Sequence, residues 1–365
     1  MAKPVLAIIT DAIRYDNHHP LGYFSRIRPV HFYRQAPYGD LKKKDLKKAI
    51  KYEDLKDLEE KLLKLRPDII QGAEPYGSKI QLKLCYLAQK ISRKLKIPLI
   101  FPMLENRPNN MRFGPLIGPL MRLVLKKYAQ KASLIFYLNS GARKNLLEAG
   151  VGPKKMKRFL YGIWGVDTYL FRPNLPTPLT LNAIPYILFV GRLDEAKGIS
   201  YLLEAWERIQ GEFPKVELVF IGNGKWGNRV KNKEGIRMKY KGQMKTQDLP
   251  PYYANALFTL YPSVTLKRWE EQVGMVNLQS LACGTPVVTT ESGAIPEYIN
   301  SKVGILVPER DSNALAEAMR KLLKDEKLRK KLGHAGRKYI LENFDAKKTV
   351  GKVEKVLLVL LKHYN

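Results

Sequence analysis

Residues 186–209 read as a strand, a short loop and a helix in immediate succession, and this order constrains the fold more than any other feature. Tyr186 to Val190 is an apolar run with the length of a buried strand, and the amphipathic segment from Ile199 to Ile209 predicts a helix. Such units build the α/β class, in which helices cover a parallel sheet. The loop carries Arg192 and Lys197. Arginine offers a planar fork to phosphate and lysine a point charge, although most such cations are simply solvated.

A second segment combines a carboxylate, a glycine and the start of a helix. Glu271 precedes Gly274, and a helix-like segment follows from Met275 to Ala282. The free N–H groups of the first turn, at Gly274, Met275 and Val276, can bind phosphate oxygens, helped by the positive end of the helix dipole. The carboxylate can accept hydrogen bonds from sugar hydroxyls. An acidic first turn on a purely structural helix is the alternative interpretation.

Further short motifs recur between and around these two segments. They are Val190-Gly191-Arg192-Leu193, Lys197-Gly198, Ile221-Gly222-Asn223-Gly224, Tyr240-Lys241-Gly242, Pro262-Ser263, Glu271 and Ala282 to Val288. In this order and spacing the chain resembles glycosyltransferase family 4, the retaining nucleotide-sugar transferases, of archaeal type. The resemblance covers Tyr186 to about Phe344 and continues more weakly upstream, through residues 140–150 and 165–173.

The resemblance implies a GT-B fold, an α/β architecture of two Rossmann-like domains facing each other across a cleft. It also implies a metal-independent reaction without a cofactor, in which Arg192, Lys197 and Glu271 are catalytic. The two cations would neutralise the donor diphosphate, and Glu271 would orient the transferred sugar. The acceptor's proton would pass to the leaving phosphate, so no general base is assigned. The remaining donor-binding positions are Gly191, Gly222, Gln243, Met244, Gly274, Met275, Val276 and Gln279, with the base at Gln243 and Met244 and the ribose at Gln279.

Two departures from the family pattern matter. Gln279 stands where the family has a second glutamate. Glutamine keeps a carbonyl acceptor and adds donors, so either an altered nucleotide preference or a loss of activity would follow. The first half also lacks the family's Gly-Gly loop and a histidine after the strand at residues 98–101, where Glu105 and Asn106 stand instead.

The first half alternates strand-like and helix-like segments, with strands at residues 5–10, 30–34, 67–72, 98–101 and 134–138, a charged helix at 46–65 and a further helix at about 78–95. Glu74 and Glu105 each follow a strand, at the sheet edge where α/β domains bind ligands. We therefore expect Glu74, Glu105 and Asn106 on the acceptor side, the rival interpretation being carboxylates that cap helices. His18 could also touch an acceptor, although simple exposure of this histidine is the commoner outcome, and a metal site is not expected.

Four prolines between residues 173 and 185 mark an interdomain linker. We expect an acceptor-side domain over residues 1–172, a nucleotide-sugar domain over 186–343, and a last helix over 344–365 that returns to the first domain.

The net charge of +30 is concentrated in the first half, where residues 1–172 carry 34 basic and 14 acidic side chains. Two cysteines and no signal peptide favour a cytoplasmic protein. The expected partners are a UDP-, GDP- or ADP-linked sugar and a glycan or lipid-linked acceptor. The charge favours an anionic membrane surface as a further partner, the alternative being generic solubility or the lysine-rich surface typical of a hyperthermophile. No nucleic acid is expected, because no nucleic-acid-binding motif is present.

One basic, apolar segment is open to two interpretations. Residues 106–147 contain eight basic side chains and no acidic one, and residues 115–132 combine leucines with Arg122, Lys126 and Lys127. Such a helix can lie on an anionic membrane surface, but more often it packs on its own sheet. For the whole chain, the alternatives to a transferase are an inactive GT-B scaffold, a basic protein that binds nucleic acid or anionic surfaces, and an epimerase of the same fold.

Overall fold

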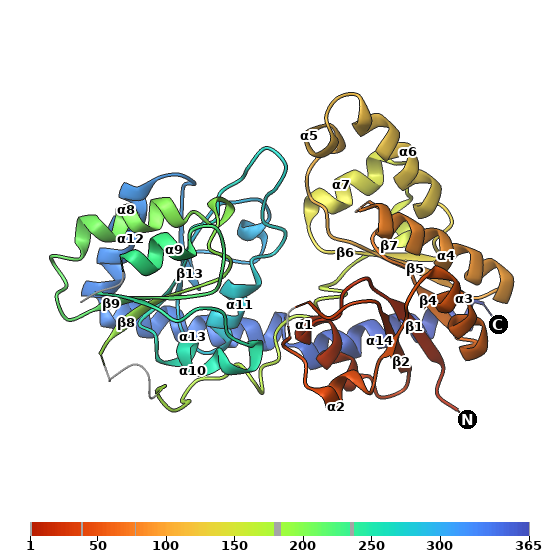
Figure 1. The fold of residues 1–365 in the computed structure, drawn as a ribbon, viewed down its shortest axis with the longest axis horizontal. Helices are drawn as coiled ribbons and strands as arrows, with labels where there is room; N and C mark the ends of the chain where they lie inside the picture. Colours follow the sequence, from red (N-terminus) through yellow and green to blue (C-terminus); the bar gives the residue numbers. More distant parts are fainter. Residues whose placement is uncertain (1, 38, 77, 179–183, 234–236, 365) are drawn as a thin grey trace. The chain divides into compact units, whose positions relative to one another are not determined.

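The computed structural model describes residues 2–37, 39–76, 78–178, 184–233 and 237–364. The chain forms two compact units (Figure 1). Unit 1 comprises Met1–Gly165 and Ala346–Asn365, and unit 2 comprises Val166–Asp345. No helix among the described residues is long and apolar enough to cross a membrane.

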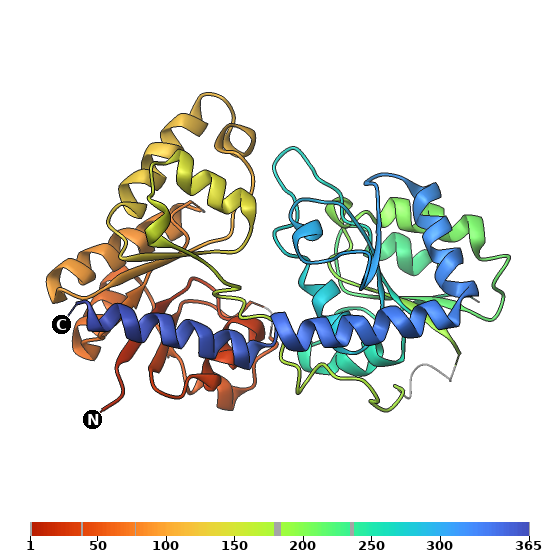
Figure 2. The same cartoon turned by 180° about the vertical axis from the view of Figure 1, so that it is seen from behind.

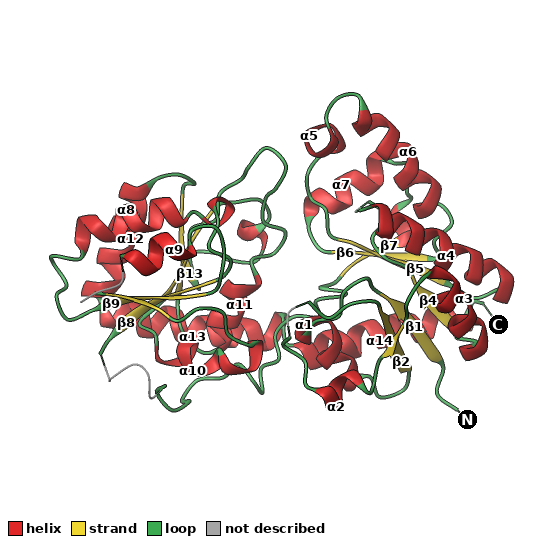
Figure 3. Cartoon of the chain, viewed as in Figure 1, coloured by secondary structure: helices red, strands yellow, loops and turns green. Residues whose placement is uncertain are grey.

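Unit 1 is built on a parallel sheet with the strand order β3-β2-β1-β4-β5-β6-β7 (Figure 3). Most of the strands are short buried runs, as the apolar segments of the sequence predict. Their bounds are Val5–Ile9 (β1), Arg28–Tyr33 (β2), Ile50–Lys51 (β3), Ile69–Gln71 (β4), Leu99–Met103 (β5), Leu134–Tyr137 (β6) and Met156–Arg158 (β7). The helices are α1 (Tyr15–His18), α2 (Lys43–Leu46), α3 (Leu55–Leu65), α4 (Lys79–Leu95), α5 (Asn109–Phe113), α6 (Ile117–Ala129), α7 (Ser140–Glu148) and α14 (Ala346–Lys362), with 3₁₀ turns η1 (His19–Tyr23) and η2 (Pro153–Lys155).

The prediction of one charged helix over residues 46–65 is wrong. Residues 50 and 51 instead form β3, the edge strand beside β2, and the helix begins only at Leu55. Asp54 fixes that start, because its carboxylate accepts hydrogen bonds from the N–H groups of Lys56 and Asp57. The pairing of β3 with Phe32 and Tyr33 could not be seen in the local pattern of charged residues.

The last helix, α14, belongs to unit 1. Figure 2, which turns the molecule by 180°, shows this helix in blue. Val350, Val353 and Leu357 pack with strand residues and with the η1 segment in one hydrophobic cluster. Glu354 is 3% exposed and accepts hydrogen bonds from the N–H groups of residues 25, 26 and 27 at 2.6–2.9 Å. The helix therefore completes the core of unit 1 on one face of the sheet, while α3, α4, α6 and α7 cover the other.

Unit 2 repeats this plan with a six-stranded parallel sheet in the order β10-β9-β8-β11-β12-β13. The strands are β8 (Tyr186–Val190), β9 (Glu217–Ile221), β10 (Met238–Tyr240), β11 (Thr259–Tyr261), β12 (Val287–Thr290) and β13 (Gly304–Val307). The helices are α8 (Ile199–Ile209), α9 (Gly227–Asn232), α10 (Pro250–Asn255), α11 (Met275–Ala282), α12 (Ser312–Lys324) and α13 (Glu326–Asn343), with 3₁₀ turns η3 (Glu195–Lys197), η4 (Thr246–Asp248) and η5 (Ile295–Glu297).

The chain enters unit 2 at Val166, earlier than the predicted end of the first domain at residue 172. Val166 forms a bridge with Asp345, and Arg337 donates a hydrogen bond to the carbonyl of Phe171. These contacts hold residues 166–172 on unit 2. Of the predicted linker, residues 173–178 also belong to unit 2, and residues 179–183 lie outside the described residues.

Both sheets have the strand order of a Rossmann fold, which confirms the predicted α/β class with two Rossmann-like domains. The order reverses between β1 and β4 in unit 1, and between β8 and β11 in unit 2. In such sheets ligands bind beyond the carboxyl ends of the strands at this switch point. The fold therefore directs attention to the loops after β1 and β4, and to those after β8 and β11. That the two domains face each other across a cleft stays a prediction.

Candidate functional site

The loop after β8 lies against the loops after β11 and β9 because two glycines allow close approach. Gly198 has a φ of 65°, and a Cβ atom on it would lie 1.9 Å from the carbonyl oxygen of Pro262. A Cβ atom on Gly222, whose φ is 139°, would lie 1.8 Å from the carbonyl oxygen of Gly191. Only glycine tolerates both the backbone angle and the contact. The three loops that follow β9, β8 and β11 therefore lie against one another.

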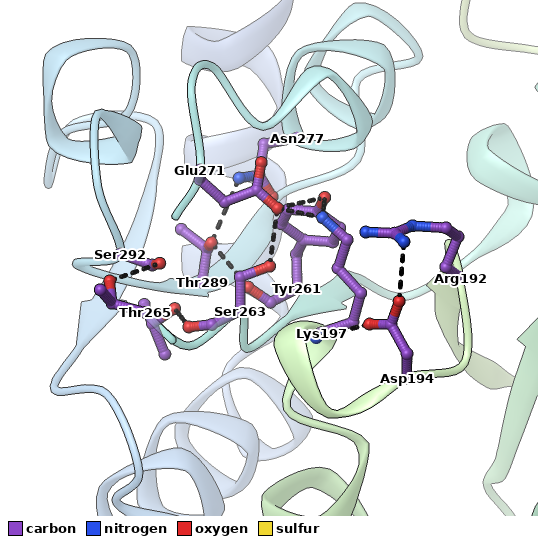
Figure 4. Close-up of polar contacts among 11 residues, drawn as sticks. Arg192, Asp194, Lys197, Tyr261, Ser263, Thr265, Glu271, Asn277, Thr289 and Ser292 are labelled. Carbon is purple, nitrogen blue, oxygen red and sulfur yellow. Dashed lines mark hydrogen bonds and ion pairs between the residues drawn. The ribbon is translucent and has the colours of Figure 1, made fainter. Parts of the chain in front are cut away.

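Lys197 and Glu271 form a buried ion pair at the centre of these loops (Figure 4). They are 7% and 6% exposed. The Lys197 ammonium also donates a hydrogen bond to the Tyr261 hydroxyl at 2.7 Å, and its Nζ atom lies 4.3 Å from the ring centre of Trp269. The structure thus brings together two of the three predicted catalytic residues, which lie far apart in the sequence.

The Glu271 carboxylate is the acceptor on which this cluster converges. Its Oε1 atom accepts hydrogen bonds from the Tyr261 hydroxyl at 2.7 Å and the Ser263 hydroxyl at 2.9 Å, as well as from the lysine. Burial lowers the pKa of Lys197, while the attraction of Glu271 opposes this shift. Burial also raises the pKa of the Tyr261 phenol well above its usual value. The cluster is a dense polar network whose members hold one another in place.

Arg192, the third predicted catalytic residue, lies on the same loop but is more exposed. Its guanidinium is 3.0 Å from the carboxylate of Asp194, and its side chain is 63% exposed. Its charge still acts on Lys197, lowering that pKa further. Asp194 also caps η3 by accepting a hydrogen bond from the backbone N–H of Lys197 at 3.2 Å. Arg192 therefore has room to move toward a ligand, whereas Lys197 is fixed.

The predicted phosphate-binding turn begins α11 in the same segment as Glu271. Gly274 is the N-cap residue with a φ of 74°, and Met275 and Val276 open the helix. Among the described residues, no hydrogen bond uses the N–H groups of these three positions. Asn277 follows them and donates to the Thr289 hydroxyl at 3.2 Å, which ties the turn to β12. The turn can offer its N–H groups to an anion.

The residues predicted to hold the nucleoside lie near the carboxyl ends of β9 and β10. The N–H of Gly222 donates to the carbonyl of Gly242 at 2.8 Å, and Asn223 donates to the Gln243 side chain at 3.1 Å. Met244 follows Gln243 and is partly exposed. Gln279 lies on α11, where its carbonyl oxygen accepts a hydrogen bond from the Tyr253 hydroxyl at 3.3 Å.

Unit 1 has a cavity of about 340 Å³ at its own switch point. It lies beyond β1 and β4 and is lined by polar side chains that include Asp11, Arg14, Asn17, Glu74 and Gln81. Glu74 is the one predicted acceptor-side residue found there. Its carboxylate accepts hydrogen bonds from the N–H groups of residues 104 and 105 at 2.7 Å, and burial raises the pKa of this carboxyl to about 7. The cavity is the candidate acceptor site.

The other three acceptor-side predictions do not line this cavity. Glu105 is buried and pairs with Arg112, and Asn106 is buried beside it. Both are held in a loop whose carbonyls accept hydrogen bonds from Asn145. Tertiary packing of this loop on α7 turns them away from the cavity.

The expectation that His18 is simply exposed is wrong. His18 is 8% exposed, and its Nδ1 atom lies 3.1 Å from Nδ1 of His31. It lines a second hollow of unit 1, together with residues of η1, and burial lowers its pKa. The neighbouring His31 lines both hollows and hydrogen-bonds Thr10 at 2.8 Å.

Sequence reasoning missed several residues of the two sites. Tyr261 and Ser263 surround Glu271, and Trp269 lies over Lys197. A signal was available, because Tyr261 ends a buried strand and Ser263 follows within two residues, at the sheet edge where ligands bind. Asp11 and Arg14 of the unit 1 cavity lie in the long polar loop after β1, which the sequence indicates as a place for binding residues without singling out these two.

In the part of the chain that the structure describes, no group of three or more His, Cys, Asp or Glu side chains is placed to hold a metal ion.

Two Rossmann-like units with polar side chains at both switch points define a two-domain α/β protein of the GT-B kind. Comparison with known proteins agrees with this class. Residues 180–339, a little under half of the chain, match the family model of glycosyl transferases group 1. The match falls on unit 2, where the ion pair lies, and supports a glycosyltransferase.

Curated relatives point the same way. The sulfoquinovosyl transferase SQD2 of Arabidopsis thaliana is 24% identical over 80% of this chain and 56% of its own length. The GDP-mannose-dependent alpha-(1-6)-phosphatidylinositol monomannoside mannosyltransferase of Mycobacterium tuberculosis is 28% identical over 61% of this chain and 60% of its own length. The chain thus spans little more than half the length of these relatives.

Solved structures share the fold over nearly the whole chain. Sucrose-phosphate synthase from Thermosynechococcus elongatus has a TM-score of 0.74 at 18% identity, with 99% of this chain and 100% of that chain covered. Anabaena Alr3699/HepE in complex with UDP has a TM-score of 0.76 at 16% identity, with 98% and 100% covered. At these identities the likeness concerns the fold alone.

Proposed function

We propose that the chain is a retaining glycosyltransferase of family 4 that moves a hexose from a nucleotide-diphosphate sugar to a hydroxyl group, without a metal ion or cofactor. The observation that carries this proposal is the buried Lys197–Glu271 pair at the switch point of unit 2. A buried ion pair is costly to desolvate and adds little to stability compared with apolar packing. Its position at the ligand-binding edge of the sheet supports a role in binding and catalysis.

The pair and its surroundings suit the chemistry of a leaving diphosphate. The bond between the anomeric carbon and the diphosphate oxygen breaks, and the acceptor oxygen bonds to the same carbon. The acceptor's proton passes to the leaving phosphate. Arg192, Lys197 and the N–H groups that open α11 supply positive charge where negative charge develops, which is commonly the largest catalytic contribution. Glu271 would accept hydrogen bonds from hydroxyls of the transferred sugar.

Support for the donor class comes from the relatives. Solved structures of the Anabaena protein contain UDP and UDP-glucose, and the mycobacterial relative is named as GDP-mannose-dependent. We propose a UDP-, GDP- or ADP-linked hexose for this chain, with the base near Gln243 and Met244. Gln279 would contact the ribose through its side-chain amide, whose oxygen also accepts a hydrogen bond from the Tyr253 hydroxyl.

The acceptor would bind in the unit 1 cavity. Asp11, Asn17, Glu74 and Gln81 present carboxylate and amide groups there, which suit the hydroxyl groups of a glycan or of a lipid-linked sugar. This proposal requires the predicted cleft between the domains, because donor and acceptor sites lie on different units. We further propose a cytoplasmic protein that contacts an anionic membrane face and does not bind nucleic acid.

The first test is a melting-temperature screen of the full chain against UDP, GDP, ADP and their sugars. A ligand at a hundred times its Kd should stabilise the folded protein by about 2.7 kcal/mol. Sugar transfer to a glycan acceptor is then measured with the donor that stabilises most. Stabilisation without transfer would favour the inactive scaffold, and no stabilisation by any nucleotide would contradict donor binding in unit 2.

A further inference from the structure

The helices α5 and α6 of unit 1 present apolar side chains to solvent. Leu116 is 90% exposed, Leu120 59% and Leu123 61%, and Met111 and Ile117 are also more than half exposed. Leu116, Leu120 and Leu123 lie four and three residues apart, so they share one side of the helical segment. We call these five residues the apolar ledge. Contiguous exposed apolar side chains of this size mark interaction sites more often than ordinary surface.

The ledge is not needed to hold α6 on its own unit. The opposite side of the helix supplies Leu125, Tyr128 and Ala129 to the core, and the Tyr128 ring lies 6.5 Å from that of Phe101. The helix start is packed against α5, because a Cβ atom on Gly118 would lie 2.3 Å from the Asn110 side chain. One side of α6 therefore packs in the core of unit 1, as the second interpretation of this segment predicts. The other side of the helix carries the exposed leucines of the ledge.

Positive charge continues the ledge along the helix. Arg122, Lys126 and Lys127 are exposed on α6, and residues 106–147 contain no acidic side chain. An anionic bilayer has acyl chains that would contact the leucines and, beside them, lipid phosphates that would bind the cations. A second copy of this chain fits less well, because two such surfaces would repel each other. Nucleic acid fits less well, because it offers no apolar partner for aliphatic side chains.

We propose that the apolar ledge and the adjoining Arg122, Lys126 and Lys127 form a membrane-docking surface, which enters the headgroup region of an anionic bilayer. This inference deepens the peripheral membrane location given under the proposed function, and it assigns that contact to named residues. The leucines insert among the acyl chains, and the three cations bind lipid phosphates. The docked unit then holds its acceptor cavity close to the bilayer, where a lipid-linked acceptor lies.

The test measures co-sedimentation of the full chain with vesicles of phosphatidylcholine alone or mixed with phosphatidylglycerol. Wild type should bind the mixed vesicles and bind the neutral ones far less. The triple variant Leu116→Ser, Leu120→Ser, Leu123→Ser should lose at least about tenfold in binding to the mixed vesicles. The triple variant Arg122→Gln, Lys126→Gln, Lys127→Gln should lose about a hundredfold there, at about fivefold for each cation.

Matched controls lie on unit 2 and on α14. Lys327→Gln, Lys331→Gln, Lys338→Gln removes the same charge from exposed positions of α13, and Val359→Ser removes an exposed apolar side chain from α14. Both controls should bind vesicles like wild type. Melting temperatures confirm folding, since all substituted side chains are exposed.

Three outcomes would overturn the proposal. Wild type could bind both kinds of vesicle equally, the α13 control could lose as much as the α6 variant, or the leucine variant could bind unchanged. Loss of a dimer in the leucine variant, with no vesicle binding by wild type, would assign the ledge to a second copy. Nucleotide-induced melting shifts are measured on the same samples, so a failure of docking is distinguished from a failure of donor binding.

Discussion

The buried Lys197–Glu271 pair couples stability and binding at the scale of single residues. Their side chains are 9% and 8% exposed, and Lys197 donates hydrogen bonds to both Glu271 and Tyr261. Removing one charge leaves the other buried without compensation, which typically costs about 3–5 kcal/mol. From the sequence alone we expect a change at Lys197 to act mainly on turnover, whereas the burial of the ion pair predicts an effect on folding as well.

A double-mutant cycle separates the two effects. We expect Lys197→Met to lower the free energy of unfolding by about 3 kcal/mol, and Lys197→Met with Glu271→Gln to recover most of that loss, because no unpaired charge remains buried. Transfer activity should stay abolished in both variants. The measurements are urea unfolding and sugar transfer. Additive losses of stability in the double variant would contradict a direct pairing.

Glu74 makes a pH-dependent contribution to stability. Burial raises the pKa of its carboxyl to about 7 in the folded protein, above its value in the unfolded chain. The folded state therefore holds a proton that the unfolded state releases, so stability should fall as pH rises from about 4.5 to about 7. The loss should not exceed about 2 kcal/mol, since the side chain is partly exposed to the cavity.

The variant Glu74→Gln isolates this titration. Glutamine can still accept hydrogen bonds from the N–H groups of residues 104 and 105, but it does not titrate. The free energy of unfolding of the variant, relative to that of wild type, should therefore increase as pH rises across that window. Urea unfolding at several pH values measures the difference. Glu53→Gln, at an exposed position, is the control and should track wild type. Parallel pH profiles of Glu74→Gln and wild type would show that Glu74 does not titrate in this range.

At the scale of elements, α14 is fastened to unit 1 by one carboxylate. Glu354 accepts four hydrogen bonds from residues 25–27, three of them from backbone N–H groups. Its side chain thus caps the segment after η1 from a helix more than three hundred residues away in the sequence.

We expect Glu354→Ala to lower the free energy of unfolding by about 3 kcal/mol, because it leaves buried N–H groups without an acceptor. Glu354→Gln keeps one acceptor oxygen and should cost about half as much. Urea unfolding provides the comparison, and Glu342→Ala on the exposed side of α13 is the matched control. Equal, small effects of Glu354→Ala and Glu342→Ala would mean that the cap does not stabilise the unit.

Elements with strong local patterns were predictable, and those that depend on distant partners were not. The strand at Tyr186–Val190 and the helix at Ile199–Ile209 agree with β8 and α8, because apolar length and periodicity alone define them. The two-residue strand β3 forms only because β2 lies beside it.

The same distinction applies to the sites. The motif around Glu271 could be located from sequence, but its pairing with Lys197 depends on how β8 and β11 neighbour each other in the sheet. Glu105 and Asn106 lie outside the unit 1 cavity because their loop packs on α7, and His18, on α1, is buried beside His31 of β2. Spacing along the chain does not report such contacts.

At the scale of the whole molecule, both units use the same strand order, and their chemistry lies at equivalent places in the two sheets. Unit 1 has its cavity beyond β1 and β4, and unit 2 has its ion pair beyond β8 and β11. The charge of +30 is unevenly divided, with most of the surplus in the first half of the sequence. Most of the net positive charge thus lies on the unit that carries the candidate acceptor cavity, which favours anionic partners for that unit.

The chain leaves unit 1 at Gly165 and returns to it only at Ala346. A ribosome therefore synthesises every residue of unit 2 before it makes α14. During translation unit 2 can mature first, while the face of the first sheet that packs against Val350, Val353 and Leu357 stays uncovered until α14 has been made. Nascent chains that stall before α14 has been made would expose this face, and they are the species that we expect chaperones to recognise.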